Sequence, residues 1–247
     1  MESFQQTKSI AKREWGSYFN SPVAYVFIMI FLVLAGFFTF AVSQFFESGQ
    51  ADLRAFFVWH PWLYLILVPA VAMRLWSEER RARTIELLLT LPITPWQAIC
   101  GKFLAAWLFL ILSVVLTFPI VLTAMYLGQL DLGVVLCGYV GSILLAGAYL
   151  AIGMCTSALT KNQVISFILS VVIGLFFILA GFPPVTDLLS RFSPVWLVDA
   201  IAAFSFMAHY EALQRGVLDV RDVVYFASII GFMLLGTHIV LRTRAAQ

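Results

Sequence analysis

Long uncharged stretches alternate with short charged clusters along this 247-residue chain. A helix that crosses the hydrocarbon core of a bilayer needs about 20 mostly apolar residues. The stretches that are long enough predict spans over residues 22–45, 55–76, 95–127, 132–160, 162–182 and 223–241. We therefore expect an all-α integral membrane protein with six transmembrane helices, in which residues 1–247 form one transmembrane domain.

The basic residues give these spans an orientation. If both termini face the cytoplasm, the inner segments hold eleven of the 15 Lys and Arg residues and the outer segments hold four. Basic residues are enriched on the cytoplasmic side of membrane proteins. Residues 128–131, between the third and fourth spans, contain none, as expected for a short outer turn. The pattern predicts cytoplasmic termini in a bacterial inner membrane.

Capping residues predict where two of the spans begin. Ser21 precedes Pro22, and a serine cap followed by proline at the first helical position favours a helix start. Thr94 precedes Pro95, and Gln97 completes a capping box with Thr94. The first span is therefore expected to start at Pro22, and the third near Pro95 on the cytoplasmic side.

Two further segments are predicted to lie at the membrane surface. Residues 3–20 place Phe4, Trp15 and Phe19 at helical spacing while basic residues fall on other faces, which predicts an amphipathic helix on the inner leaflet. Residues 183–222 connect the last two spans and are too apolar for a solvated linker. We expect them to form one or two helices packed at the periplasmic surface.

The composition excludes several classes of protein. Hydrophobic residues make up 62% of the chain and charged residues 11%, so a water-soluble domain could not bury its apolar surface. A net charge of +2 provides no basic surface for nucleic acid. The cysteines lack CxxC spacing, and no metal site is predicted. The spans contain no carboxylates, which argues against an ion-coupled carrier, and no HExxH or GxSxG motif indicates an intramembrane enzyme.

Residues 77–92, between the second and third spans, combine dense charge with a short apolar face. Glu and Arg residues crowd the first half, while Ile85, Leu88 and Leu89 share one face of a helix that Pro92 ends. Two interpretations fit this pattern. One is an ordinary inner loop that stays polar because of the topology, and the other is a cytoplasmic helix that docks into a partner.

A longer motif that begins in this segment resembles a known family. Its residues are Glu79, Thr84, Glu86, Leu87, Pro92 and Gly101-Lys102, which resemble the E, GT, E, L, P and GK positions of ABC type 2 transporter permeases. The resemblance extends over essentially the whole chain. Within the family the chain resembles the gliding-motility type, which shares the Ser-Pro entry to the first span and a segment similar to residues 215–225. Arg83 departs from the pattern, because the family usually has glycine there.

The resemblance implies that residues 77–92 are a coupling helix that seats in a cleft of a separate cytoplasmic ABC ATPase. The implied coupling residues are Glu78, Glu79, Arg80, Arg81, Arg83, Thr84, Ile85, Glu86, Leu87, Leu88, Leu89 and Pro92. The charged members would select the ATPase, and the apolar members would supply buried contact.

The chain has no phosphate loop of the form GxxxxGK[ST], because Phe103 follows Gly101-Lys102. ATP and Mg²⁺ are therefore expected on the partner ATPase. No catalytic residue and no cofactor is expected on this chain.

The second and fifth spans of the family border the translocation path, which implies four candidates for lining it. They are His60, Phe176, Phe177 and Phe182. From the pattern alone, a histidine between two tryptophans is typical of an interfacial belt, and the phenylalanines are typical of lipid-facing or core positions. In the fourth span a stripe of small residues lets helices approach closely. This stripe favours packing within the subunit, with a dimer seam as the alternative.

Six spans supply half of a transport path, so a second permease copy is expected, most simply in a homodimer. We predict a permease subunit that couples ATP hydrolysis by its partner to export of a substrate. Periplasmic or membrane accessory proteins and the lipid bilayer are further expected partners, and nucleic acid is not. The alternative is a membrane scaffold or anchor that holds an extracytoplasmic complex together and transports nothing.

Overall fold

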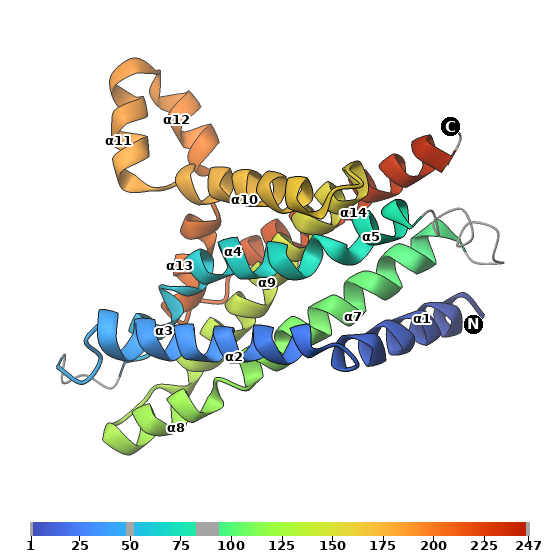
Figure 1. Ribbon diagram of the computed structural model, residues 1–247. Coiled ribbons are helices and arrows are strands. Elements are labelled where there is room, and N and C mark those ends of the chain that lie inside the picture. Colours follow the sequence, from blue (N-terminus) through green and yellow to red (C-terminus); the bar gives the residue numbers. More distant parts are fainter. Residues whose placement is uncertain (1, 48–51, 83–93, 246–247) are drawn as a thin grey trace.

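The chain folds into a bundle of helices (Figure 1). The computed structural model describes residues 2–47, 52–82 and 94–245, and every regular element in these ranges is helical. In chain order the elements are α1 (Glu2–Phe19), α2 (Pro22–Phe37), the π-helix η1 (Phe38–Val42), α3 (Arg54–Phe57), α4 (His60–Ala72), α5 (Arg74–Arg81), α7 (Pro95–Val115), α8 (Phe118–Leu127), α9 (Leu132–Leu159), α10 (Gln163–Leu179), α11 (Pro183–Phe192), α12 (Val195–Ala202), α13 (Phe206–Gln214) and α14 (Val220–Ala245).

Most of the predicted spans appear as long apolar helices. Of the described residues, the stretches long and apolar enough to cross a membrane are Pro22–Val42, Arg54–Arg81, Pro95–Leu127, Leu132–Leu159 and Val220–Thr243. A sixth span requires α10 and α11 together, and these two helices are bent by 74° at the break between them. With 17 residues, α10 alone is about 25 Å long, against a hydrocarbon core of roughly 30 Å. The all-α membrane architecture is confirmed, with five clear spans among the described residues, or six if the bent pair of α10 and α11 counts as one span.

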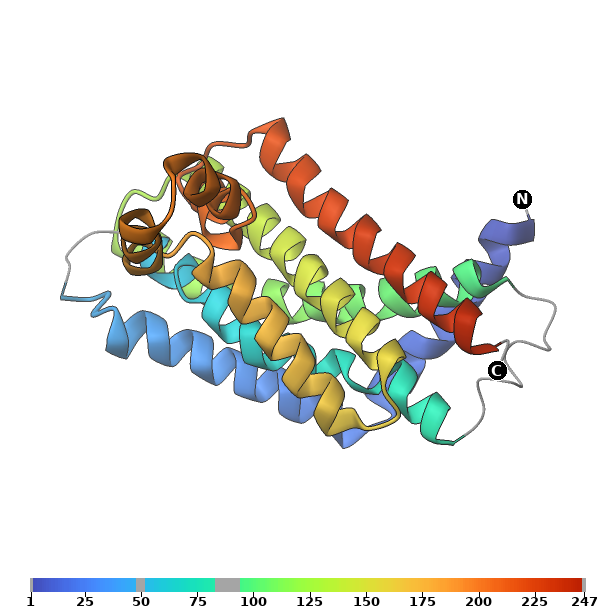
Figure 2. The ribbon, with the colours of Figure 1, turned by 90° about the horizontal axis from the view of Figure 1, so that it is seen from above.

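Both termini lie at the same end of the bundle (Figure 1, Figure 2). This inner end also holds the end of α5, the start of α7 and the turn between α9 and α10. The outer end holds the turn between α8 and α9 and the helices α11 to α13. The names inner and outer follow the predicted orientation, in which the termini are cytoplasmic.

The helix starts that the capping residues predict are confirmed. Ser21 Oγ accepts a hydrogen bond from the backbone N–H two residues later, at 3.3 Å. Thr94 Oγ1 accepts from Gln97 N at 3.4 Å, and Gln97 Oε1 accepts from Thr94 N at 2.8 Å, which completes the capping box. Helix α7 therefore has a defined start at Pro95, directly after residues 83–93.

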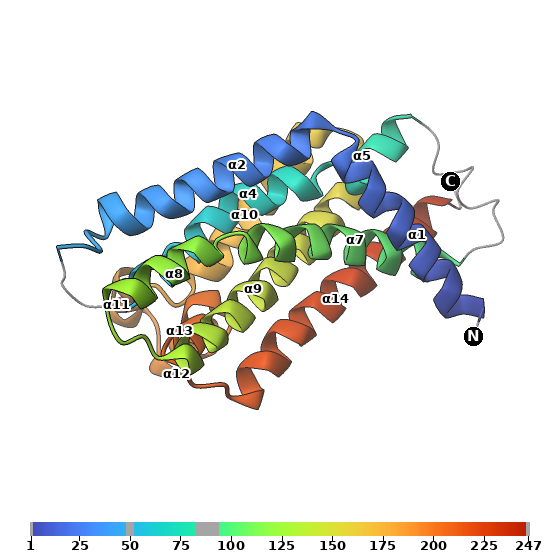
Figure 3. The same ribbon diagram turned by 90° about the horizontal axis from the view of Figure 1, so that it is seen from below.

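Helix α9 is the centre of the bundle and packs against α4, α5, α7, α10, α13 and α14 (Figure 3). Its glycines let the neighbouring helices approach. A methyl group on Gly138 would come within 2.5 Å of the Phe57 ring, and one on Gly147 within 2.9 Å of Trp107 Nε1. The small residues of this span thus pack within the subunit, as the sequence favours.

The outward faces of the bundle are apolar. Met29 on α2, Phe176 on α10 and Phe232 on α14 are 65%, 58% and 71% exposed. Apolar side chains exposed along whole helices need a nonaqueous neighbour, which is lipid or another apolar protein surface. This surface is the one that composition predicts for a protein dissolved in a bilayer.

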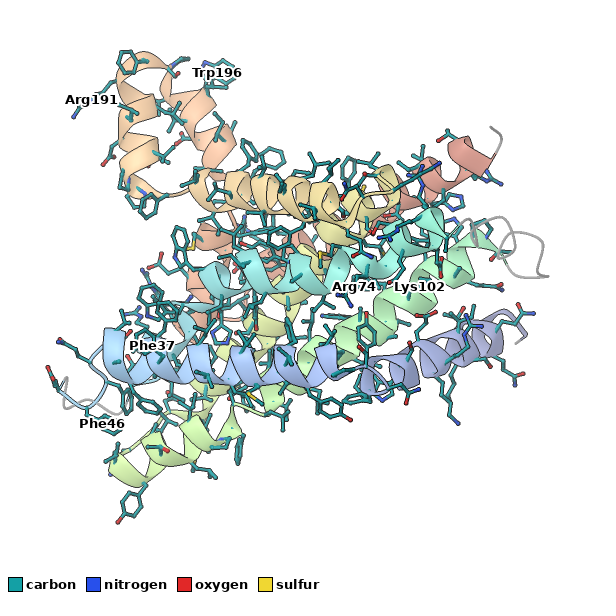
Figure 4. The ribbon with its side chains drawn as sticks, viewed as in Figure 1. Phe37, Phe46, Arg74, Lys102, Arg191 and Trp196 are labelled. Atoms are coloured by element: carbon teal, nitrogen blue, oxygen red, sulfur yellow. The ribbon has the colours of Figure 1, made fainter. Side chains whose placement is uncertain are left out.

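Residues 183–222 form three helices, where the sequence predicts one or two. Helices α11 and α12 make a hairpin that projects from the outer end, with Trp196 on its outside (Figure 4). A third helix arises because Ser205 caps a new start by accepting hydrogen bonds from two following N–H groups. This helix, α13, turns back to the bundle, where Tyr210 OH lies 2.8 Å from Ser142 Oγ of α9.

Candidate coupling site at the inner end

Helix α5 carries the described part of the predicted coupling segment. The sequence predicts that span two stops at residue 76, but α5 stays helical to Arg81, so residues 77–81 form the inner end of that span. The coupling candidates Arg83, Thr84, Ile85, Glu86, Leu87, Leu88, Leu89 and Pro92 lie outside the described residues. The structure places the base of the segment, which consists of Glu78, Glu79, Arg80 and Arg81.

Ser157 of α9 binds the start of α5 through hydrogen bonds. Its Oγ accepts hydrogen bonds from the backbone N–H groups of Trp76 and Ser77, both at 3.0 Å, and donates to Met73 O at 2.9 Å. The first N–H groups of a helix have no partner within that helix. Here the acceptor comes from a side chain about 80 residues later in the chain, so the start of α5 is held against the inner half of α9.

Arg80 points toward α9 and not toward solvent. It is 8% exposed, and its Nη1 donates to the carbonyl oxygen of Ala158. Because α9 ends at Leu159, this guanidinium lies at the carbonyl end of a helix, where the dipole favours a cation. Glu78 and Arg81, by contrast, are exposed. Of the described coupling candidates, these two have exposed charges.

Lys102 of α7 connects α5 with α1. Its Nζ lies 2.8 Å from Glu79 Oε1 and 3.2 Å from Glu14 Oε1, and 5.5 Å from the centre of the Trp76 ring. The lysine side chain is only 6% exposed. A buried cation is stable only beside its counter-charges, so the two carboxylates hold three helices together at this point.

Gly101 explains how α1 reaches the site. A methyl group at this position would come within 2.7 Å of Ile10 Cγ2, so α1 could not pack as closely against α7. Both residues of the Gly101-Lys102 pair thus have a structural role, since the glycine admits α1 and the lysine binds it through Glu14. The sequence marks the pair only as part of a motif. Nothing in the sequence distinguishes Glu14 or Ser157 from other polar residues.

Tyr18 lies next to this cluster on α1. Its ring stacks on Phe109 of α7, with centroids 5.0 Å apart and 9° between the ring planes. Burial, and to a lesser extent the Glu14 carboxylate, raise the pKa of its hydroxyl above the ordinary value of 10.0. The phenol is therefore neutral at physiological pH and adds no charge to the cluster.

The four path candidates lie in different surroundings. His60 is fully buried within a cage of aromatic rings, whereas the sequence pattern is typical of an interfacial belt. Phe176 faces outward, and Phe177 stacks on a phenylalanine of α13 at 4.7 Å between centroids. Phe182 meets a tryptophan of α4 edge-on at 6.3 Å. Their part in a transport path stays a prediction.

The arrangement at the inner end can transmit movement. Displacing α5 would pull on α9 through Ser157 and on α7 and α1 through Lys102. Within the described ranges, no group of three or more His, Cys, Asp or Glu side chains is placed to hold a metal ion. The polar groups that the structure brings together at the inner end form contacts between helices.

Comparison with protein families gives a match over almost the whole chain. A family model described as "ABC-2 family transporter protein" matches residues 8–241. That range includes all the predicted spans and the predicted coupling segment. A comparison with curated proteins found no match.

Proposed function

The chain belongs to the ABC-2 family of transporter proteins and is a permease subunit of an ABC transporter, and from this premise we propose that it couples ATP hydrolysis to export of a substrate. The ATP and Mg²⁺ would be bound by a separate cytoplasmic ATPase, because this chain has no phosphate loop. A second copy of the permease would complete the path, most simply in a homodimer.

One observation carries the coupling mechanism. Helices α5 and α7 lead into and out of residues 83–93, and the Lys102–Glu79 ion pair of 2.8 Å joins these two helices directly behind that segment. The two helices that flank residues 83–93 are therefore tied to each other. Such a base supports transmission of force to the bundle, because a displacement of either helix end would reach the other through the ion pair.

The movement that displaces the coupling segment would come from the ATPase. When two nucleotide-binding subunits close on ATP, a loop seated in each of them is displaced as a rigid body. In this chain the displacement would reach α9, the centre of the bundle, through Ser157 and Arg80. Because α9 packs against α4, α10 and α14, its movement would change the relative tilt of several spans at once.

The alternative function is a membrane scaffold that transports nothing. The observation in its favour is the α11–α12 hairpin, whose exposed side chains include Phe192 at 82% and Trp196 at 70%. An apolar surface of this kind suits an accessory protein or the outer face of the bilayer. The hairpin is compatible with both functions, whereas the ion pair between α5 and α7 at the inner end favours coupling.

The test uses the permease purified together with its ATPase and reconstituted in vesicles. Leu88→Lys and Glu86→Lys alter the apolar face and the charge of the proposed coupling segment. Because a well-buried contact residue contributes about 2 kcal/mol or more to an interface, we expect the permease-stimulated ATPase rate to fall at least about tenfold.

Arg242→Gln is the matched control, because Arg242 is also exposed at the inner end but lies on α14, outside the segment. It should leave assembly and rate unchanged. If Leu88→Lys and Glu86→Lys also leave both unchanged, the coupling proposal is wrong and the scaffold remains.

A further inference from the structure

A cavity of about 580 Å³ opens next to the inner end, between α1 and α2 on one side and α4, α5 and α7 on the other. Its volume is that of a typical small-ligand site. The polar part of its lining includes Ser17, Ser21, Arg74 and Glu78, backed by the Lys102 ion pairs. The apolar part is lined by Val23, Val26, Phe27, Ile30, Leu67 and Val71. The cavity is thus polar at one end and apolar at the other.

The two parts of the cavity match two levels of a bilayer. The polar part lies where α1, the amphipathic helix, meets the start of α2, which is the level of the lipid headgroups. The apolar part follows α2 from Val23 to Ile30, or roughly 10 Å along the helix axis. An amphiphile could therefore place its headgroup in the polar part and the start of an acyl chain in the apolar part.

The charges of the polar part fall into a paired group and an unpaired group. Lys102 is paired with both Glu14 and Glu79, and Arg13 Nη2 lies 3.6 Å from Glu14 Oε1, so two cations face two carboxylates in this group. Arg74 and Glu78 lie one turn apart on α5 and are both exposed, and neither has an ion-pair partner among the described residues. Figure 4 labels Arg74 and Lys102 at the inner end, and both residues line the cavity.

We propose that the cavity binds a zwitterionic glycerophospholipid of the inner leaflet. Arg74 would bind its phosphate, with the Ser17 and Ser21 hydroxyls as further donors. Glu78 would bind the ammonium group of the headgroup. Arg74 and Glu78 carry one charge of each sign, so a zwitterionic headgroup matches both, whereas a headgroup with only a phosphate charge leaves Glu78 facing a like charge. An amino-containing headgroup such as ethanolamine therefore fits better than glycerol.

A lipid in this position would act on the base of the coupling loop. Its headgroup would contact α5 at Arg74 and Glu78, and its acyl chain would separate α2 from α4. The lipid would thus hold α5 at a fixed distance from α1 and α2. This role is independent of what the transporter exports.

The test measures lipid binding to the delipidated permease alone by native mass spectrometry, with phosphatidylethanolamine and phosphatidylglycerol as the two probes. We expect phosphatidylethanolamine to bind at least about tenfold more tightly. The charge-assisted hydrogen bond from its ammonium group to Glu78 raises the binding constant by roughly that factor. Arg74→Ala should abolish this tight binding, and Glu78→Gln should remove the preference for phosphatidylethanolamine. Arg81→Ala is the matched control, since Arg81 is exposed on the same helix but does not line the cavity.

A second pair of variants tests the apolar part. Val26→Trp should fill it and lower phosphatidylethanolamine binding about tenfold, whereas Val33→Trp, on the same helix but away from the cavity, should not. Both positions are exposed, so neither change disturbs the core. Tighter binding of phosphatidylglycerol, or equal binding of both lipids that none of these substitutions alters, would overturn the proposal. Because no ATPase is present, the result does not depend on whether the coupling function holds.

Discussion

Lys102 Nζ lies 2.8 Å from Glu79 Oε1, and this buried ion pair joins the helix that enters residues 83–93 to the helix that leaves them. Glu14 shares the same ammonium at 3.2 Å, so the amphipathic helix α1 is tied to the same point. The inner ends of the second and third spans and helix α1 therefore meet at one lysine.

Lys102→Met should destabilise the permease strongly. The methionine keeps most of the side-chain volume, but it removes the ammonium group that Glu14 and Glu79 share. Breaking a buried ion pair by removing one partner costs roughly 3–5 kcal/mol. Thermal unfolding in detergent measures the loss. The exchanged pair Lys102→Glu with Glu79→Lys should recover part of what Lys102→Glu alone loses, and a Lys102→Met protein as stable as the parent would contradict the assignment.

Ser157→Ala should loosen the start of α5. The change removes the acceptor of two backbone N–H groups and the donor to Met73 O. A buried donor left without a partner costs about 1–3 kcal/mol. We expect a comparable loss of stability and faster hydrogen exchange at the amides of Trp76 and Ser77. Ser228→Ala is the control, because Ser228 is exposed and bonds only within its own helix, and equal exchange in both variants would exclude the proposed role.

Gly101→Ala and Gly36→Ala should have opposite effects. In a helix interior, alanine is more favourable than glycine by about 1 kcal/mol. Gly36 has open space around it, so Gly36→Ala should stabilise the protein by up to that amount. At Gly101 the new methyl group would meet Ile10 at 2.7 Å, and overpacking costs about 1–3 kcal/mol. Adding Ile10→Ala should relieve the clash. Unfolding temperatures of the variants measure these effects, and a Gly101→Ala protein as stable as the parent would show that α1 does not pack here.

Tyr18 makes stability depend on pH at the alkaline end. Because its pKa is raised in the folded protein above the ordinary 10.0, the stabilisation is fully present below about pH 10 and is lost as the pH rises further. Tyr18→Phe cannot ionise and should show a shallower decline between about pH 9 and about pH 11. Unfolding temperatures over this range measure the slope. Parallel slopes for the two proteins would mean that Tyr18 is not enclosed between α1 and α7.

The coupling segment shows how far sequence reasoning reaches at this site. Its charges and apolar spacing fit both an ordinary inner loop and a docking helix, and the family match over residues 8–241 supports a permease. Within the described base, however, the pattern treats Arg80 and Arg81 alike, whereas the structure buries the first against α9 and exposes the second. On an α-helix, the side chains of two consecutive residues point about 100° apart. Only the position of the neighbouring helix determines which of the two is covered.

By itself, the sequence determined five long apolar helices, the helix starts at Pro22 and Pro95, and the membrane class of the protein. These features depend on hydropathy and on capping groups within a few residues, so they are local. Only the tertiary structure decided that Glu14 and Glu79 share Lys102, and that Ser157 holds the start of α5. Such contacts join residues up to about 90 positions apart, and they exist only because helix packing brings those side chains to the same place.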